Sequence, residues 1–122
     1  MVAFLRTLLI TILFYGGSAL FVPLVGLSAV ISKDALMRGC NLWARWHRVC
    51  TRWFLGIRLR VQGEIPPGGH FFVVKHESMY EAIDTLAFFD KPMVVFKKEL
   101  LDIPVWGWVA RRHGVIAIDR SA

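Results

Sequence analysis

The residues from Lys75 to Glu81 have the chemical groups needed for acid–base catalysis. His76 follows an apolar run at 70–75 that is typical of a strand, and open α/β sheets place their ligands at strand ends. Glu81 lies five residues later, on the first turn of a predicted helix, so that both side chains can face one crevice. A carboxylate that fixes the tautomer of an imidazole raises its basicity, as a general base acting on an alcohol requires.

A purely structural interpretation fits the same residues. Ser78 and Glu81 form the S-x-x-E pattern of a capping box, which closes the start of a helix without any catalytic role. His76 could equally be a polar loop residue. The spacing alone leaves both interpretations open.

The elements around this string predict an α/β fold. Alternating apolar residues at 57–62, a continuous apolar run at 70–75, and shorter runs at 93–96 and 115–118 predict strands. Helical patterns at 78–89 and 106–112 lie between them, and such alternation is typical of an α/β domain. We expect this domain, with a mixed sheet, to occupy residues 57–122.

The first 32 residues predict a membrane segment. They contain 26 consecutive residues without formal charge, from Thr7 to Ser32, and about 20 apolar residues suffice to cross a bilayer. Gly16, Gly17, Pro23 and Gly26 interrupt this stretch, which leaves either one kinked crossing or two short helices that enter one leaflet and return. A buried core hairpin is the soluble alternative, and a cleaved signal peptide is disfavoured because the apolar run is too long.

Residues 33–56 predict a basic amphipathic helix at the membrane surface. Seven basic residues against Asp34 give residues 33–60 a net charge of +6, which accounts for the excess of the whole chain. This local excess favours an anionic membrane over nucleic acid as the partner. Tryptophan sits well at headgroup depth, so we expect membrane contact from one set of side chains, although a core helix with solvated arginines remains the alternative. The set comprises Trp43, Trp46, Trp53, Arg45, Arg48 and Arg52.

Three blocks in order resemble the glycerolipid acyltransferases, in particular the bacterial 1-acyl-sn-glycerol-3-phosphate (lysophosphatidate) acyltransferases. His76 to Glu81 resembles the family's H-x-x-x-x-D block. Lys97-Lys98-Glu99-Leu100-Leu101, followed by Pro104 and Gly107, resembles its K-x-E-L…P…G segment. The string from Gly114 to Arg120 resembles its G-x-x-F-I-D-R block. Glu81 replaces the usual Asp with one extra methylene, and Ala117 replaces the usual aromatic residue.

The resemblance implies an acyl transfer and assigns roles to four residues. His76, held by Glu81, would deprotonate the sn-2 hydroxyl of lysophosphatidate, which would attack the thioester of acyl-CoA or acyl-carrier protein. Arg120 would grip the substrate phosphate, and Gly114 would let the backbone approach it closely. No metal or other cofactor is implied. The family's E-G-T-R block does not occur in these residues, so we expect the chain to correspond to the amino-terminal part of such an enzyme.

Two other functions remain open from the sequence. The chain could be a membrane-binding module without activity, because residues 1–60 alone would explain such a role. It could also acylate another lysolipid, such as a lyso-aminolipid that has no phosphate. In each case the basic flank of the apolar segment predicts that the α/β part lies in the cytoplasm. The resemblance implies that the membrane is a bacterial-type inner membrane. Cys40 and Cys50 are expected to be free thiols in that reducing compartment.

Overall fold

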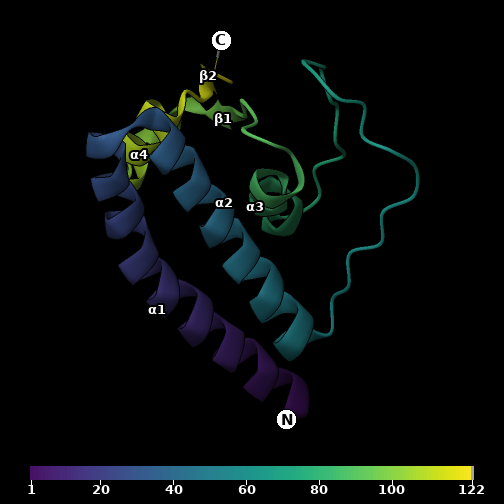
Figure 1. Ribbon diagram of the computed structural model, residues 1–122. Coiled ribbons are helices and arrows are strands. Elements are labelled where there is room, and N and C mark those ends of the chain that lie inside the picture. Colours follow the sequence, from purple (N-terminus) through teal and green to yellow (C-terminus); the bar gives the residue numbers. More distant parts are fainter. Residues whose placement is uncertain (122) are drawn as a thin grey trace.

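The computed structural model describes residues 1–121, and these are mostly helical (Figure 1). The elements follow one another as α1 (Val2–Ile31), α2 (Lys33–Cys50), the π-helical turn η1 (Thr51–Leu55), α3 (Met79–Phe88), β1 (Val95–Lys97), the 3-10 helix η2 (Lys98–Asp102), α4 (Trp106–His113) and β2 (Ile116–Ile118).

Helices α1 and α2 form an antiparallel hairpin that runs the length of the molecule (Figure 1). Ser32 makes the reversal in an extended conformation, and its hydroxyl caps α2 by accepting a hydrogen bond from the Ala35 N–H at 3.0 Å. Glycines allow the close approach of the two helices: a Cβ atom at Gly39 would lie 2.9 Å from the Val25 side chain. The hairpin is therefore a packed unit of two complete helices.

Helix α1 is apolar on all sides and mostly exposed. Of its residues only Phe14, Val25, Gly26 and Ala29 are buried, and it is long and apolar enough to cross a membrane. It continues as one helix through Pro23, so of the two arrangements that the sequence left open for residues 1–32, two short helices do not form. A core helix would be largely buried, which α1 is not.

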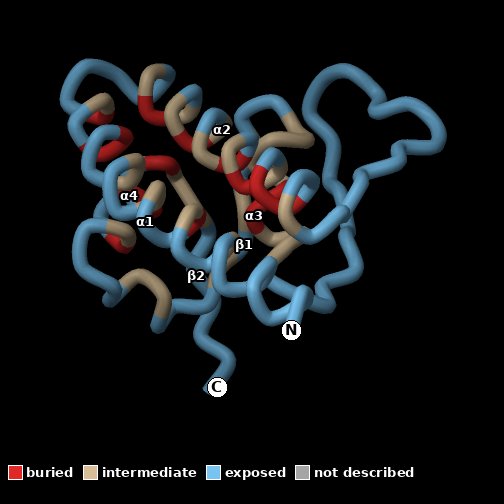
Figure 2. The backbone as a smooth tube through the Cα atoms, turned by 90° about the horizontal axis from the view of Figure 1, so that it is seen from below, coloured by how far each residue is buried: buried red, intermediate tan, exposed pale blue. Residues whose placement is uncertain are grey.

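The core lies where α2 meets its neighbours (Figure 2). One stripe of α2 is buried, and it consists of Leu36, Cys40, Ala44, His47 and Cys50. Near the turn of the hairpin this stripe packs with Val25, Ala29 and Val109, and near the other end with Phe14 and Ile83. Both cysteines are free thiols, as predicted. Apolar contacts with the buried stripe of α2 thus hold α1, α3 and α4 together.

The described sheet is smaller than the sequence predicts. Strands β1 and β2 pair in parallel with Val95 opposite Ile116, joined through η2 and α4, and this confirms two predicted strands and the predicted helix at 106–112. The predicted strands at 57–62 and 70–75 do not form, and the two-stranded sheet is parallel rather than mixed. Residues 56–78 instead make a long connection without regular structure, in which Phe71 is 90% exposed. The alternation of apolar and polar residues at 57–62 is typical of a half-buried strand. However, no described strand lies alongside this segment to form backbone hydrogen bonds with it.

Candidate active site

The start of α3 is held by a complete capping box. The Ser78 hydroxyl accepts a hydrogen bond from the Tyr80 N–H at 3.2 Å, and the Glu81 carboxylate accepts one from the Ser78 N–H. The same carboxylate also accepts a 2.6 Å hydrogen bond from the Ser78 hydroxyl. The structural interpretation of S-x-x-E is therefore confirmed.

His76 contacts the carboxylate that closes this box. Its Nδ1 atom lies 3.3 Å from Glu81 Oε1, although the two residues are separated by the loop-to-helix junction. The imidazole is 68% exposed and the carboxylate 22% exposed, so the ring has a face free for a substrate while the carboxylate is largely covered. The structure thus brings the two predicted catalytic residues together.

Hydrogen bonding keeps Glu81 ionised. Donation from the Ser78 hydroxyl, with a further contribution from the Ser78 backbone, lowers the pKa of Glu81 to about 2. A carboxylate that is charged at neutral pH favours the tautomer of His76 with the proton on Nδ1, which leaves Nε2 as the basic nitrogen. This arrangement can remove a proton from an alcohol held over the exposed face of the ring.

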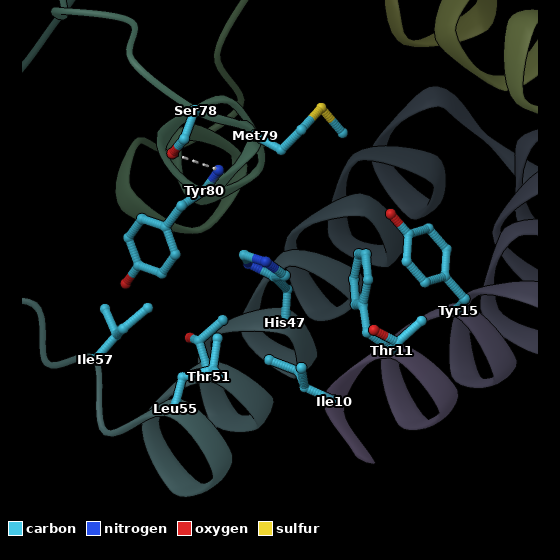
Figure 3. A pocket seen from close by; sticks show the side chains of 11 residues that line it. Ile10, Thr11, Tyr15, His47, Thr51, Leu55, Ile57, Ser78, Met79 and Tyr80 are labelled. Atoms are coloured by element: carbon cyan, nitrogen blue, oxygen red, sulfur yellow. Dashed lines mark hydrogen bonds between the residues drawn. The ribbon is translucent and has the colours of Figure 1, made fainter. Parts of the chain in front are cut away.

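A pocket of about 260 Å³ adjoins the capping box (Figure 3). Ser78, Met79 and Tyr80 form one wall, and side chains from α1, α2 and η1 form the others. Its lining is mainly apolar, with Ile10, Phe14 and Leu55 among the contributing residues. An apolar ligand there would contact Ser78 and Met79, which follow His76 by two and three residues in the sequence.

The second predicted site lies on the two-stranded sheet. Arg120 and Lys97 line one shallow pocket together with Glu99, because the parallel register sets Lys97 opposite Ile118. Neither His76 nor Glu81 lines this pocket. Gly114 caps the carboxyl end of α4 with a φ of +94°, a conformation that side chains rarely adopt. The glycine is explained by this turn, and its contact with phosphate stays a prediction.

Of the six residues expected at the membrane, three contact other parts of the protein and three are exposed. Trp43 donates a 2.8 Å hydrogen bond to Ser18 Oγ, and Trp46 stacks on Phe21, so both contact α1. Arg48 pairs with Asp84. Trp53, Arg45 and Arg52 remain exposed, and contact with lipid stays a prediction for them.

The sequence analysis missed Asp84, which binds Arg48 through two hydrogen bonds of 2.8 and 3.0 Å and joins α3 to α2. A signal was present, because Asp84 is a charged residue beside Ile83 on the buried face of α3. His47 and Tyr80 were also missed; their rings lie 5.5 Å apart beside the apolar pocket. Among residues 1–121 there is no group of three or more His, Cys, Asp or Glu side chains that could hold a metal ion.

The structure thus combines a long, exposed apolar helix with a contact between His76 and Glu81, and two known acyltransferases are similar to the chain in sequence. The chain is 38% identical over 81 residues to the 1-acyl-sn-glycerol-3-phosphate acyltransferase of Pseudomonas aeruginosa, covering 65% of this chain and 32% of that protein. It is 29% identical over 100 residues to the protein of the same name from Helicobacter pylori, covering 80% of this chain and 42% of that protein. No family model and no solved structure matches the chain. The chain therefore spans less than half the length of these curated relatives.

Proposed function

We propose that residues 1–122 form part of an enzyme that transfers an acyl group to the sn-2 hydroxyl of lysophosphatidate to give phosphatidic acid. The observation that carries this proposal is the contact of His76 Nδ1 with Glu81 Oε1 at 3.3 Å, made by an imidazole that is 68% exposed. The names of the two relatives support the same reaction.

His76 acts as the general base in this reaction. Its Nε2 atom takes the proton of the substrate hydroxyl, and the oxygen attacks the carbonyl carbon of an acyl-CoA or acyl-carrier protein thioester. The thiolate then leaves and takes up this proton from the His76 imidazolium, which the Glu81 carboxylate stabilises while it exists. Holding the two substrates in line supplies much of the rate, because the thioester is already an activated donor.

The substrate phosphate binds beside β2. Arg120 offers a guanidinium group whose geometry matches phosphate oxygens, and Lys97 from β1 adds a second positive charge in the same pocket. Two basic side chains there favour a phosphate-bearing acceptor over a lyso-aminolipid.

The enzyme works at a membrane surface, with the hairpin of α1 and α2 as its anchor. Lipid contact by the exposed side of α1 would cover a large apolar surface, and the basic residues of α2 would meet anionic headgroups. The positive charge of residues 33–60 favours the cytoplasmic face of a bacterial inner membrane. The same hairpin is the observation that favours the second candidate, a membrane-binding module without activity.

Replacing His76 tests the enzymatic proposal. We expect His76→Ala to reduce acyl transfer from acyl-CoA or acyl-carrier protein to lysophosphatidate by about 10²–10⁴-fold in the protein that carries this chain. His70→Ala is the matched control, since His70 is an exposed histidine of the same connection whose contacts, with the Pro67 carbonyl at 3.0 Å and the Phe72 ring, do not involve Glu81. Equal measurable rates for wild type and His76→Ala would contradict the role of His76, and the absence of any transfer by wild type would favour the inactive membrane module.

A further inference from the structure

The Glu81 carboxylate presents one oxygen to His76 and the other to Ser78. Its Oε1 atom lies 3.3 Å from His76 Nδ1 and also accepts hydrogen bonds from the backbone N–H groups of Glu77 and Ser78. Its Oε2 atom accepts a 2.6 Å hydrogen bond from the Ser78 hydroxyl. The two oxygens therefore differ in what holds them, because the donors to Oε1 from residues 77 and 78 belong to the backbone, whereas the hydroxyl on Oε2 depends on the identity of a side chain.

The Ser78 hydroxyl is itself fixed in this position. Its oxygen accepts a 3.2 Å hydrogen bond from the Tyr80 N–H at the start of α3 (Figure 3). A hydroxyl has one hydrogen to donate, and here that hydrogen is directed at Glu81. The backbone of Ser78 is extended, with φ −153° and ψ 176°, a conformation that any residue adopts. The backbone conformation therefore does not require serine, and the contacts of the side chain do.

A donor on Oε2 bears on catalysis because the carboxylate of a glutamate turns easily. The last torsion of a Glu side chain has a broad energy minimum in place of sharp staggered wells. A hydrogen bond from a hydroxyl to a carboxylate is short and strong, as the 2.6 Å distance indicates, and the Ser78 hydroxyl is the largest cause of the low pKa of Glu81. Without this donor the carboxylate can turn and move Oε1 away from the imidazole.

We propose that Ser78 is a positioning residue of the candidate active site: its hydroxyl holds Glu81 Oε2, so that Oε1 stays beside His76 Nδ1 and the ring proton stays on that nitrogen. This proposal rests on the proposed function for the reaction in which His76 is the base. Ser78 acts through Glu81 and exchanges no proton with the substrate. Its hydroxyl thus has a role in the chemistry in addition to capping α3.

Three substitutions of Ser78 separate positioning from capping. Thr keeps both the hydroxyl and the cap, Gly keeps most of the cap without the hydroxyl, and Ala keeps neither. We expect Ser78→Thr to retain kcat within about twofold, and Ser78→Gly and Ser78→Ala both to lower kcat by about five- to fiftyfold in the protein that carries this chain. A residue that only caps α3 would give a different order, with Gly close to wild type and Ala alone reduced. That order would overturn the proposal.

Thr85→Ala is the matched control on the same helix. The Thr85 hydroxyl donates a 2.8 Å hydrogen bond to the Ala82 carbonyl, so this change removes a hydroxyl from α3 without affecting the contacts of Glu81. We expect Thr85→Ala to keep the wild-type kcat. Circular dichroism melting curves of all four variants show which of them are folded, and Ser78→Gly keeps the test decisive if Ser78→Ala does not fold.

A spectroscopic measurement on the full chain in detergent micelles needs no acyl transfer. At alkaline pH, the ¹⁵N shifts of the His76 ring should show a protonated Nδ1 and an unprotonated Nε2 in wild type and in Ser78→Thr. In Ser78→Gly the two shifts should move toward each other, because the tautomers mix once the carboxylate can turn. Identical His76 spectra for wild type and Ser78→Gly would overturn the proposal.

Failure of this proposal is distinguishable from failure of the proposed function. An unchanged rate in His76→Ala would contradict the proposed function, whatever the spectra of the Ser78 variants show. A large loss in His76→Ala, together with a wild-type kcat and wild-type His76 shifts in Ser78→Gly, would contradict the positioning role of Ser78 alone.

Discussion

At the scale of single residues, the Glu81 carboxylate serves two purposes that the spacing presents as alternatives. It accepts hydrogen bonds from the start of α3, and its Oε1 atom also lies 3.3 Å from His76 Nδ1. The capping box therefore does not compete with the catalytic pair. It fixes the position of the carboxylate that the histidine contacts, so we expect substitutions of Glu81 to affect folding and, if the proposed function holds, acyl transfer as well.

The stability of α3 should depend on pH through Glu81. The pKa of this carboxyl is about 2 in the folded chain, below its ordinary value of 4.5, so ionised Glu81 stabilises the fold above about pH 4.5. That contribution should fall as the pH drops from about 4.5 to 2. We expect wild type to melt at a higher temperature than Glu81→Gln at pH 7, and the difference to shrink over this range. Circular dichroism melting curves at several pH values measure it, and a pH-independent difference would contradict the assignment.

Some parts of the candidate site could be predicted from the sequence because they are local. His76 and Glu81 are only five residues apart, and the helix-start rule places Glu81 on the first turn of α3, although the strand predicted before His76 does not form. The pairing of Arg48 with Asp84 joins residues 36 positions apart, and no local rule identifies it. Gly107 belongs to a recognised block, but its reason appears only in three dimensions: a Cβ atom there would collide with the Leu101 carbonyl.

At the scale of elements, α3 is attached to α2 by polar as well as apolar contacts. Asp84 is 7% exposed and binds Arg48 in a two-pronged arrangement, while Asn41 donates a 2.9 Å hydrogen bond to the Leu86 carbonyl. These bonds fix the helix that begins at the capping box. The position of His76 relative to the hairpin therefore depends on them.

Removing one partner of the Arg48–Asp84 pair should cost more than removing both. Arg48→Met leaves a buried carboxylate without its partner, and we expect it to lower the free energy of unfolding by about 1.5–3 kcal/mol. The double variant Arg48→Met/Asp84→Leu buries no unpaired charge and should recover part of this loss. Denaturant titration of the single and double variants measures the coupling. Additive effects would show that the pair is not coupled.

Helices were predicted well and strands poorly, for a physical reason. A helix satisfies its backbone hydrogen bonds within one segment, so the periodicity at 78–89 and 106–112 is sufficient to locate α3 and α4. A strand needs a neighbour. The apolar runs at 93–96 and 115–118 pair as β1 and β2, which α4 separates in the sequence. The equally apolar run at 70–75 has no described strand beside it and does not form a strand, and Val73 there is 85% exposed.

At the scale of the whole molecule, the hairpin favours an interfacial over a spanning arrangement of α1. Helix α2 packs along α1, so α1 cannot cross a bilayer unless α2 crosses with it. That crossing would bring Arg38, Arg45, Arg48 and Arg52 into the hydrocarbon region of the bilayer. The free energy of inserting each arginine that reaches the bilayer centre is unfavourable by about 2.5–3.5 kcal/mol. We therefore infer that the hairpin lies in one leaflet, with the exposed apolar side of α1 toward the lipid.

Membrane binding should have an apolar part and an ionic part. The apolar surface of α1 is not screened by ions, so the full chain should float with anionic liposomes even in 1 M salt. Arg45→Gln and Arg52→Gln should each weaken binding at low salt by about 1 kcal/mol, or roughly fivefold, because these side chains are exposed. Vesicle titrations at two salt concentrations measure both parts. Release of the full chain in 1 M salt would show that α1 does not enter the lipid.

The position of the turn between α1 and α2 tests the interfacial arrangement directly. When the Ser32→Cys variant is added to preformed vesicles, we expect its new thiol to react with a membrane-impermeant thiol reagent in the outer solution. A hairpin that crosses the bilayer would instead carry this turn to the inside and protect it.

Gly69→Cys in the long connection is the control for the outer side, since that residue is exposed. The native thiols contribute little background, because both are buried and burial raises the pKa of Cys40 to about 11. Equal labelling of the two variants supports the interfacial hairpin, and protection of Ser32→Cys alone would establish that the hairpin spans the membrane.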